Sequence, residues 1–121
     1  MQIPVQITFR DMEPSAAIEE RVRERAAKLE RYFDRITSCR VIVEEPHLRQ
    51  HKGKLFHVRV DITVPGNELV ANRSSADNHA HEDVYVAIRD AFKAAERQLE
   101  EHAKKRQGRV KTHVRPEIEP L

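Results

Sequence analysis

The most regular hydrophobic pattern in the chain lies between His81 and Gln107. At about 100° per residue, its apolar residues fall on one stripe of a helix: Val84, Ile88, Ala91, Phe92, Ala95 and Leu99. Cations gather on a neighbouring face: Arg89, Lys93, Arg97 and Lys104. The pattern predicts an amphipathic helix that opens at Asp83, where the helix dipole favours an acid.

A second helix is predicted over about residues 16 to 34, because Ser15 suits an N-cap and apolar residues then recur at helical spacing: Ile18, Val22, Ala26, Leu29 and Phe33. Its charges are sorted by sign on the two sides of this stripe. The acids are Glu19, Glu30 and Asp34; the cations are Arg21, Arg25, Lys28 and Arg35. Mixed charges would form ion pairs along the helix, whereas this sorting leaves four cations adjacent.

Alternating apolar and polar residues predict four strands: 5–10, 39–45, 56–64 and 69–74. The turn at 65–68 makes the last two a hairpin. The order is therefore β-α-β-β-β-α, an α+β fold whose four-stranded mixed sheet carries both helices on its apolar face. The other face is expected to be open to water, with candidates Arg40, Arg59, Thr63 and Arg73.

The 121 residues suffice for one domain, which we place at 1–106, followed by a basic tail at 107–121. The tail lacks apolar periodicity and contains two prolines, so we expect it to be disordered in isolation. Residues 1–103 hold 16 basic and 18 acidic side chains, whereas 104–121 hold 6 and 2. Any binding of anions must therefore depend on locally segregated charge and on the basic tail.

Composition narrows the classes of function. Cys39 is the single cysteine, so no internal disulfide can form, and the N-terminus lacks the features of a secretory signal. The expected location is therefore the cytoplasm, and no apolar run is long enough to span a membrane. Without Trp and with 5% aromatic residues, a broad platform for stacking bases is not expected.

No pattern for catalysis or for a cofactor emerges. His47, His51, His79 and His81 could ligate a metal, but they fall in predicted loops without a familiar zinc motif, and solvated histidines are the competing interpretation. Cys39 is expected to be a buried, inert thiol. The three glycines are spread too widely for a phosphate-binding loop. We therefore predict neither an enzyme nor a metal site.

Two helices on one sheet face can place their basic flanks side by side and form a cationic groove. RNA phosphates match such a groove, because each nearby Lys or Arg releases condensed counterions. Structured RNA fits better than DNA, since neither helix has the residues that read bases in a major groove. Taken alone, each basic stripe is equally compatible with a solvated helix face.

Two strings resemble the ribosome hibernation promoting factor family, also called ribosome-associated inhibitor A, protein Y or sigma-54 modulation protein: AKLERYFDRI at 27–36 and EDVYVAIRDAFKAAERQL at 82–99. The resemblance extends from about residue 1 to 105. It implies a fold similar to a double-stranded RNA-binding domain. It also implies binding to the small ribosomal subunit and its ribosomal RNA, at the messenger and transfer RNA sites, which silences idle ribosomes without making or breaking a bond.

Carried over by position, the family's basic residues match Arg25, Lys28, Arg97 and Lys105. Ala94 and Glu101 stand where relatives commonly have lysines, so other cations must serve on the second helix. The predicted RNA-binding residues are therefore Arg21, Arg25, Lys28, Arg35, Arg89, Lys93, Arg97, Lys104 and Lys105. Tyr32 and Tyr85 also match family positions, but we interpret both rings as packed at the edge of the core.

Two other functions stay open: a protein-interaction module that modulates a sigma factor, and a generic binder of double-stranded RNA. A monomer is expected when the protein is free, with no membrane or DNA partner. The tail could lie along ribosomal RNA or only solubilise the domain. Family members either pair dormant ribosomes or block single ones, and the residues do not distinguish these outcomes.

Overall fold

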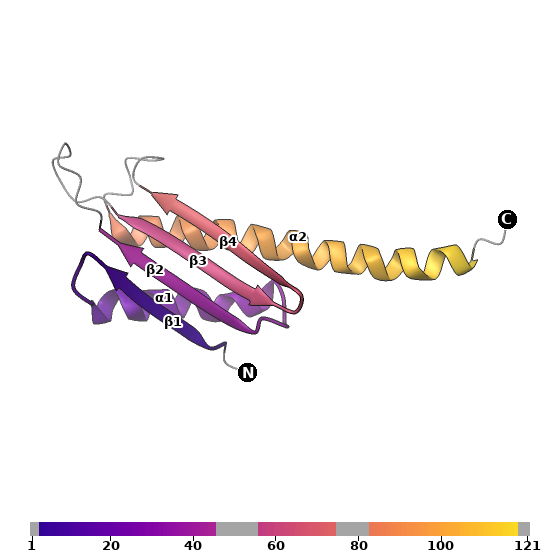
Figure 1. The fold of residues 1–121 in the computed structure, drawn as a ribbon, viewed down its shortest axis with the longest axis horizontal. Coiled ribbons are helices and arrows are strands. Elements are labelled where there is room, and N and C mark those ends of the chain that lie inside the picture. The colour runs from indigo at the N-terminus through magenta and orange to yellow at the C-terminus, as the bar shows by residue number, and fades with distance from the viewer. Residues whose placement is uncertain (1–2, 46–55, 75–82, 119–121) are drawn as a thin grey trace.

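The computed structural model describes residues 3–45, 56–74 and 83–118, and its elements follow the predicted order (Figure 1). The four strands are β1 (Val5–Arg10), β2 (Ser38–Glu44), β3 (His57–Val64) and β4 (Asn67–Ser74). The helices are α1 (Ala16–Ala27), a short 3-10 helix η1 (Lys28–Arg31), and α2 (Val84–Ile118).

The strands form one sheet in the order β1-β2-β3-β4, in which β1 is parallel to β2 and the other neighbours are antiparallel. The mixed sheet predicted from the sequence is thus confirmed. The β3–β4 hairpin turns through Pro65 and Gly66, with Val64 paired to Asn67. Pro65 sets a negative φ, and Gly66 adopts φ +76°, a combination typical of a type II turn.

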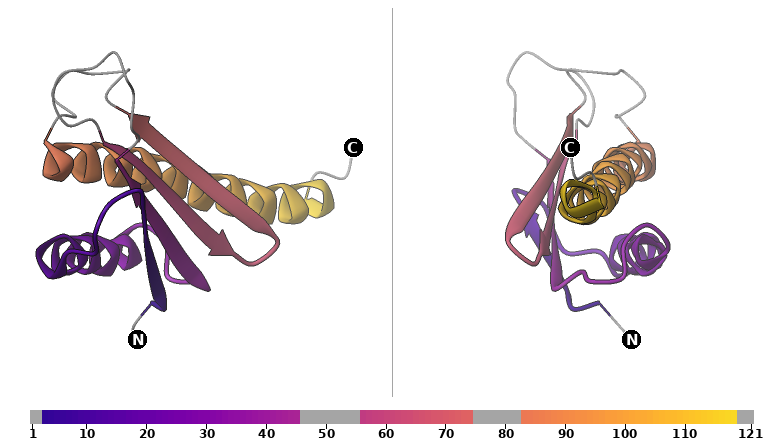
Figure 2. Two further views of the ribbon diagram at one scale, coloured as in Figure 1. Left: turned by 60° about the vertical axis from the view of Figure 1, so that its left-hand side comes forward. Right: turned by 90° about the vertical axis from the view of Figure 1, so that its right-hand side faces the viewer.

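Both α-helices cover the same face of the sheet, and in the described part of the chain the opposite face carries no helix (Figure 2). The predicted apolar stripe of α2 is buried throughout, from Val84 at 8% exposed to Leu99 at 0%. The predicted stripe of α1 and η1 is buried as well, with Phe33 the most exposed member at 9%. The core therefore lies between one sheet face and two helices, as the periodicities require.

Both predicted helix starts are correct. The amide of Ile18 donates to the hydroxyl of Ser15 over 3.3 Å, and the amide of Tyr85 donates to the carboxylate of Asp83 over 2.9 Å. Each cap satisfies an amide that the first turn leaves without a helical partner.

The first helix ends earlier than predicted. α1 stops at Ala27, and η1 tightens the chain through Arg31, whereas the sequence pattern suggested helix to residue 34. The amides of both Tyr32 and Phe33 turn back to the carbonyl of Leu29. Tighter turns of this kind commonly end an α-helix, and here they keep Leu29 and Phe33 directed into the core.

The open sheet face differs from the prediction at one residue. Arg40 pairs with Asp61, and Arg59 and Thr63 alternate with the buried side chains of β3, so these three belong to the open face as predicted. Arg73 instead pairs with the core residue Val58, so its side chain leaves the strand on the helix-covered face. Strand β4 begins at residue 67 rather than 69, and only the observed pairing fixes which of its residues face the helices.

Helix α2 continues beyond residue 106, the predicted end of the domain, to Ile118 and projects past the sheet (Figure 1). The backbone stays helical through Gly108 and Pro116, whereas the sequence predicts that the tail from residue 107 is disordered in isolation. Once the packed part of a helix is formed, each added residue needs no new nucleus, so Lys, Arg and Gln can extend it.

Candidate nucleic-acid interface

The facing sides of α1 and α2 can be identified from two contacts between them. The guanidinium carbon of Arg21 lies over the ring of Tyr85, 5.0 Å from its centroid. Phe33, which follows η1, and His102, a later residue of α2, also make contact. Their rings meet edge to face with centroids 5.0 Å apart. Residues near the start of α1 thus contact the start of α2, and later residues contact its later turns. The two helices therefore run parallel.

The basic band of the first helix lies on the side that faces α2. Arg21 is fixed there by its contact with Tyr85, and Arg25 is one turn further along the same flank. Lys28, seven residues after Arg21, lies near the same line at the start of η1. Arg21 and Lys28 are exposed, while Arg25 is half-buried. The structure thus brings together three of the four cations predicted for this helix.

On α2, the flank that faces α1 starts with Tyr85 and continues one turn later with Arg89. Lys93 follows after another turn and lies further from the sheet. Arg89 and Lys93 are both exposed. The Nε of Arg89 donates to the Asp90 carboxylate over 3.1 Å, so a neighbouring acid partly compensates its charge.

Acidic residues occupy the later turns of this flank, a feature that sequence reasoning missed. The charge of Glu96, burial, a hydrogen bond with Glu96 and the charge of Glu100 all raise the pKa of Tyr32. Both carboxylates therefore lie near Tyr32, on the α1 side of α2. The sequence alone could have revealed this, because Glu96 lies about 20° from Arg89 on a helical projection and so on the same flank. On α2, the cations of this flank are thus confined to its early turns.

Several predicted cations lie outside this interface. The side chain of Gln98 bonds to β4, and Lys105, seven residues later, shares that flank, so Lys105 lies on the side away from α1. Arg97 and Lys104 lie on the outer face of α2, about 40° and 20° further round the helix from α1 than Lys93. Arg35 follows η1 in the connection to β2 and belongs to no helix. The nine cations predicted for a single groove therefore divide into five around the interface and four peripheral ones.

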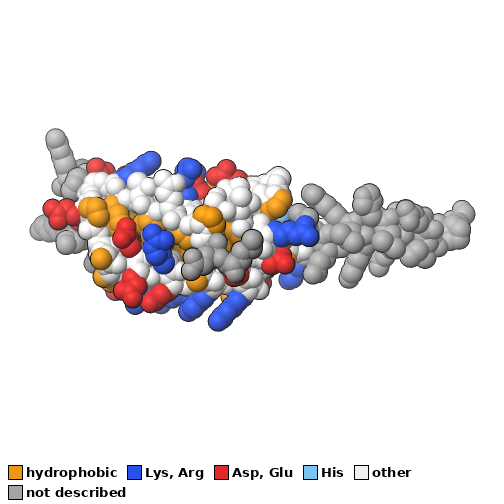
Figure 3. All heavy atoms as spheres, turned by 90° about the horizontal axis from the view of Figure 1, so that it is seen from below, with side chains coloured by type: hydrophobic (Ala, Val, Ile, Leu, Met, Phe, Trp, Pro, Cys, Tyr) orange, Lys and Arg blue, Asp and Glu red, His pale blue; other side chains and the backbone are white. Residues whose placement is uncertain are grey.

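The surface as a whole is not uniformly basic. Seen from the side of β1 and α1, Lys and Arg side chains lie among Asp and Glu, with hydrophobic side chains between them (Figure 3). Attraction of a polyanion must therefore depend on local clusters such as that of Arg21, Arg25 and Lys28.

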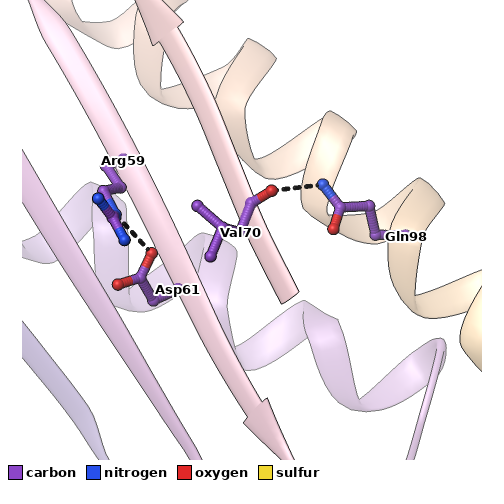
Figure 4. Close-up of polar contacts among 4 residues, drawn as sticks. All are labelled: Arg59, Asp61, Val70 and Gln98. Atoms are coloured by element: carbon purple, nitrogen blue, oxygen red, sulfur yellow. Dashed lines mark hydrogen bonds and ion pairs between the residues drawn. The ribbon is translucent and has the colours of Figure 1, made fainter. Parts of the chain in front are cut away.

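The buried polar groups have structural roles. Cys39 is 1% exposed, as expected. Burial and, to a lesser extent, the charge of Asp61 raise the pKa of its thiol to about 12. Asp61 itself, 6% exposed, accepts a 2.8 Å hydrogen bond from the Nε of Arg59 on the open sheet face (Figure 4). A thiol held in its neutral form is a poor nucleophile.

Among the residues whose side chains the structure describes, 3–45, 56–73 and 83–105, no group of three or more His, Cys, Asp or Glu is placed to hold a metal ion. The histidines considered as ligands, at 47, 51, 79 and 81, lie outside the described residues. In the same described ranges, no helix is both long and apolar enough to cross a membrane.

The fold and its charges define a class: an α+β domain whose two parallel helices present cations from one side of the sheet. The chain belongs to the family described as sigma 54 modulation protein / S30EA ribosomal protein, whose model matches residues 5–107. This confirms the family inferred from the two sequence strings.

Three relatives illustrate the similarity. The chain is 33% identical over 104 residues to a ribosome hibernation promoting factor of Pseudomonas putida, covering 86% of this chain and 90% of the relative. It is 36% identical over 101 residues to one of Azotobacter vinelandii, covering 84% and 83%. A ribosome hibernation promotion factor of Deinococcus radiodurans is 34% identical over 120 residues, which are 99% of this chain but 58% of that relative.

Solved structures agree on the fold. A ribosomal subunit interface protein from Coxiella burnetii superposes with a TM-score of 0.66 at 20% identity. The N-terminal domain of Thermus thermophilus Protein Y gives 0.65 at 24% identity. Each comparison covers 84% of this chain and 99% of the other.

Proposed function

We propose that this protein is a non-enzymatic ribosome hibernation factor that inhibits translation. It binds the small ribosomal subunit at the messenger and transfer RNA sites through the helices α1 and α2, and it contacts ribosomal RNA. Membership of the family and the names of the relatives support the ribosomal role. Such a role places the protein in the cytoplasm.

One observation carries the assignment of the surface. The basic flank of α1 faces α2, where Arg21 meets Tyr85, so Arg21, Arg25, Lys28, Arg89 and Lys93 lie around one interface. Flexible cations on two rigid helices can follow a phosphate backbone without reading its sequence. Arg35, Arg97, Lys104 and Lys105 are then peripheral contacts.

The acids further along α2 set a boundary for this surface. Glu96 and Glu100 lie near Tyr32, so a phosphate backbone placed there would meet two negative charges. In this proposal RNA crosses α1 and the early turns of α2 rather than following the whole length of α2. In this proposal residues 1–106 form the ribosome-binding domain.

Charge reversal tests the proposal. We expect the triple variant Arg25→Glu, Lys28→Glu and Arg89→Glu to lose co-sedimentation with small ribosomal subunits at physiological salt. A matched control reverses three exposed cations outside the α1–α2 interface: Arg10, Arg23 and Arg31. The control changes the net charge equally and is expected to retain most of the binding.

Thermal melts of both triple variants show whether each is folded. Undiminished binding by the first triple variant would contradict the proposed surface. Equal loss in both variants would indicate general electrostatic attraction only. Competition by an unrelated RNA duplex as effective as whole subunits would favour a generic RNA binder over a ribosome-specific one.

A further inference from the structure

The contact between Arg21 and Tyr85 joins the two helices at the cationic end of their interface. Its components come from separate elements, since Arg21 is on α1 and Tyr85 is in the first turn of α2. The backbone of Tyr85 is held by the bond from its amide to Asp83, and its half-buried ring packs against the core. The ring is therefore a fixed support, whereas the arginine lies on top of it.

An aromatic support leaves an arginine chemically different from one that is held by a carboxylate. A guanidinium over a ring is attracted through its charge and keeps its five N–H donors free for other acceptors. By contrast, the Nε of Arg59 donates to the Asp61 carboxylate over 2.8 Å. The Nε of Arg89 donates to the Asp90 carboxylate over 3.1 Å. Arg21 forms a longer ion pair, in which its Nε lies 3.7 Å from the carboxylate of Glu24, and both side chains are about half exposed.

We infer that Tyr85 is a positioning residue for RNA binding: its ring holds the guanidinium of Arg21 at the interface with its donors directed to a phosphate. The inference rests on the proposed function and adds a residue that makes no charged contact itself. Holding a flexible side chain beforehand lowers the entropy lost when RNA binds, so the effect is on affinity.

The first measurement requires no ribosome. Side-chain ¹⁵N relaxation of the Arg21 Nε–H group in the free protein reports how well the guanidinium is held. We expect Tyr85→Leu, which keeps an apolar side chain but removes the ring, to make Arg21 mobile, and Tyr85→Phe to leave it unchanged. Equal mobility of Arg21 in all three proteins would overturn the inference whether or not the protein binds ribosomes.

The second measurement is a double-mutant cycle on affinity for small ribosomal subunits. We expect Tyr85→Leu to weaken binding about two- to fivefold, the range for an exposed cation–π contact, and Tyr85→Phe to bind like the wild type. In an Arg21→Ala background, Tyr85→Leu should have no further effect, whereas in an Arg97→Ala background its effect should persist.

Three outcomes are distinguishable. Coupling to Arg21 alone supports the inference. Wild-type binding with additive effects of Tyr85 and Arg21 overturns the inference and leaves the proposed function standing. If the wild type does not bind small subunits although Tyr85 still orders Arg21, the proposed function is contradicted. The contact between the two residues would then serve only the packing of the helices.

Discussion

The side-chain amide of Gln98 on α2 donates a 2.6 Å hydrogen bond to the main-chain carbonyl of Val70 on β4 (Figure 4). Strand β4 is the last strand of the sheet, so carbonyls on its outer side have no strand partner. Gln98 satisfies one of them, and this bond agrees with the rotation of α2 that buries its apolar stripe against the sheet. That rotation places Tyr85 and Arg89 toward α1.

Removing the Gln98 amide should therefore destabilise the domain. We expect Gln98→Ala to lower the free energy of unfolding by about 1–3 kcal/mol, because a partly buried carbonyl loses its donor. Urea denaturation followed by circular dichroism measures the change. Arg97→Ala, at the adjacent exposed position, is the control and should alter stability little; equal effects in the two variants would contradict a specific role of Gln98.

The pair of Arg59 and Asp61 predicts an order of stabilities. Asp61 is buried, and the hydrogen bond and charge of its carboxylate raise the pKa of Arg59. Arg59→Met leaves that buried carboxylate without its donor, so it should lower the urea midpoint. The double variant Arg59→Met with Asp61→Leu should be more stable than Arg59→Met alone. The reverse order would show that another group, such as Arg40 on the neighbouring strand, compensates Asp61.

The buried thiol of Cys39 should resist modification until the protein unfolds. Because its pKa is raised to about 12, the reactive thiolate is scarce at pH 8. We expect Ellman's reagent to react slowly with the native protein and at once in denaturant. Fast reaction under native conditions, with circular dichroism unchanged, would contradict the burial of this side chain.

The same thiol predicts alkaline destabilisation. A raised pKa means that the folded state keeps its proton where the unfolded state, with a thiol pKa of about 8.5, has lost it. Below about pH 8.5, the contribution of Cys39 to the free energy of unfolding is constant. It falls as the pH rises from about 8.5 toward 12, by at most about 1.4 kcal/mol per pH unit. Unfolding midpoints compared between wild type and Cys39→Ala isolate the effect, since all other groups titrate in both. Parallel pH profiles would contradict it.

Helix rotation also predicts unequal effects of two lysines on ribosome binding. Lys93 lies toward the α1 side of α2, whereas Lys105 shares the flank of Gln98 on the β4 side. We expect Lys93→Glu to weaken binding to small subunits more than Lys105→Glu and to reduce the salt dependence by about one phosphate contact. Titrations at several salt concentrations measure both quantities. A larger effect at Lys105 would place the RNA on the other side of α2.

The sequence by itself determined the order of elements, both helix starts and the buried stripes. These features depend on local properties: the period of apolar residues, the capping side chains Ser15 and Asp83, and the Pro65–Gly66 turn. The family was also readable, because its two strings lie on continuous helical segments.

Only the tertiary structure decided how the charges of different elements meet. The angular position of a residue on a helix follows from its number, but the side that faces a neighbouring helix depends on packing across the core. That packing set Arg21 against Tyr85, brought Glu96 near Tyr32, and turned Lys105 away from α1. Contacts between elements far apart in the chain depend on the sum of many burial and hydrogen-bonding terms, so no local pattern in the sequence specifies them.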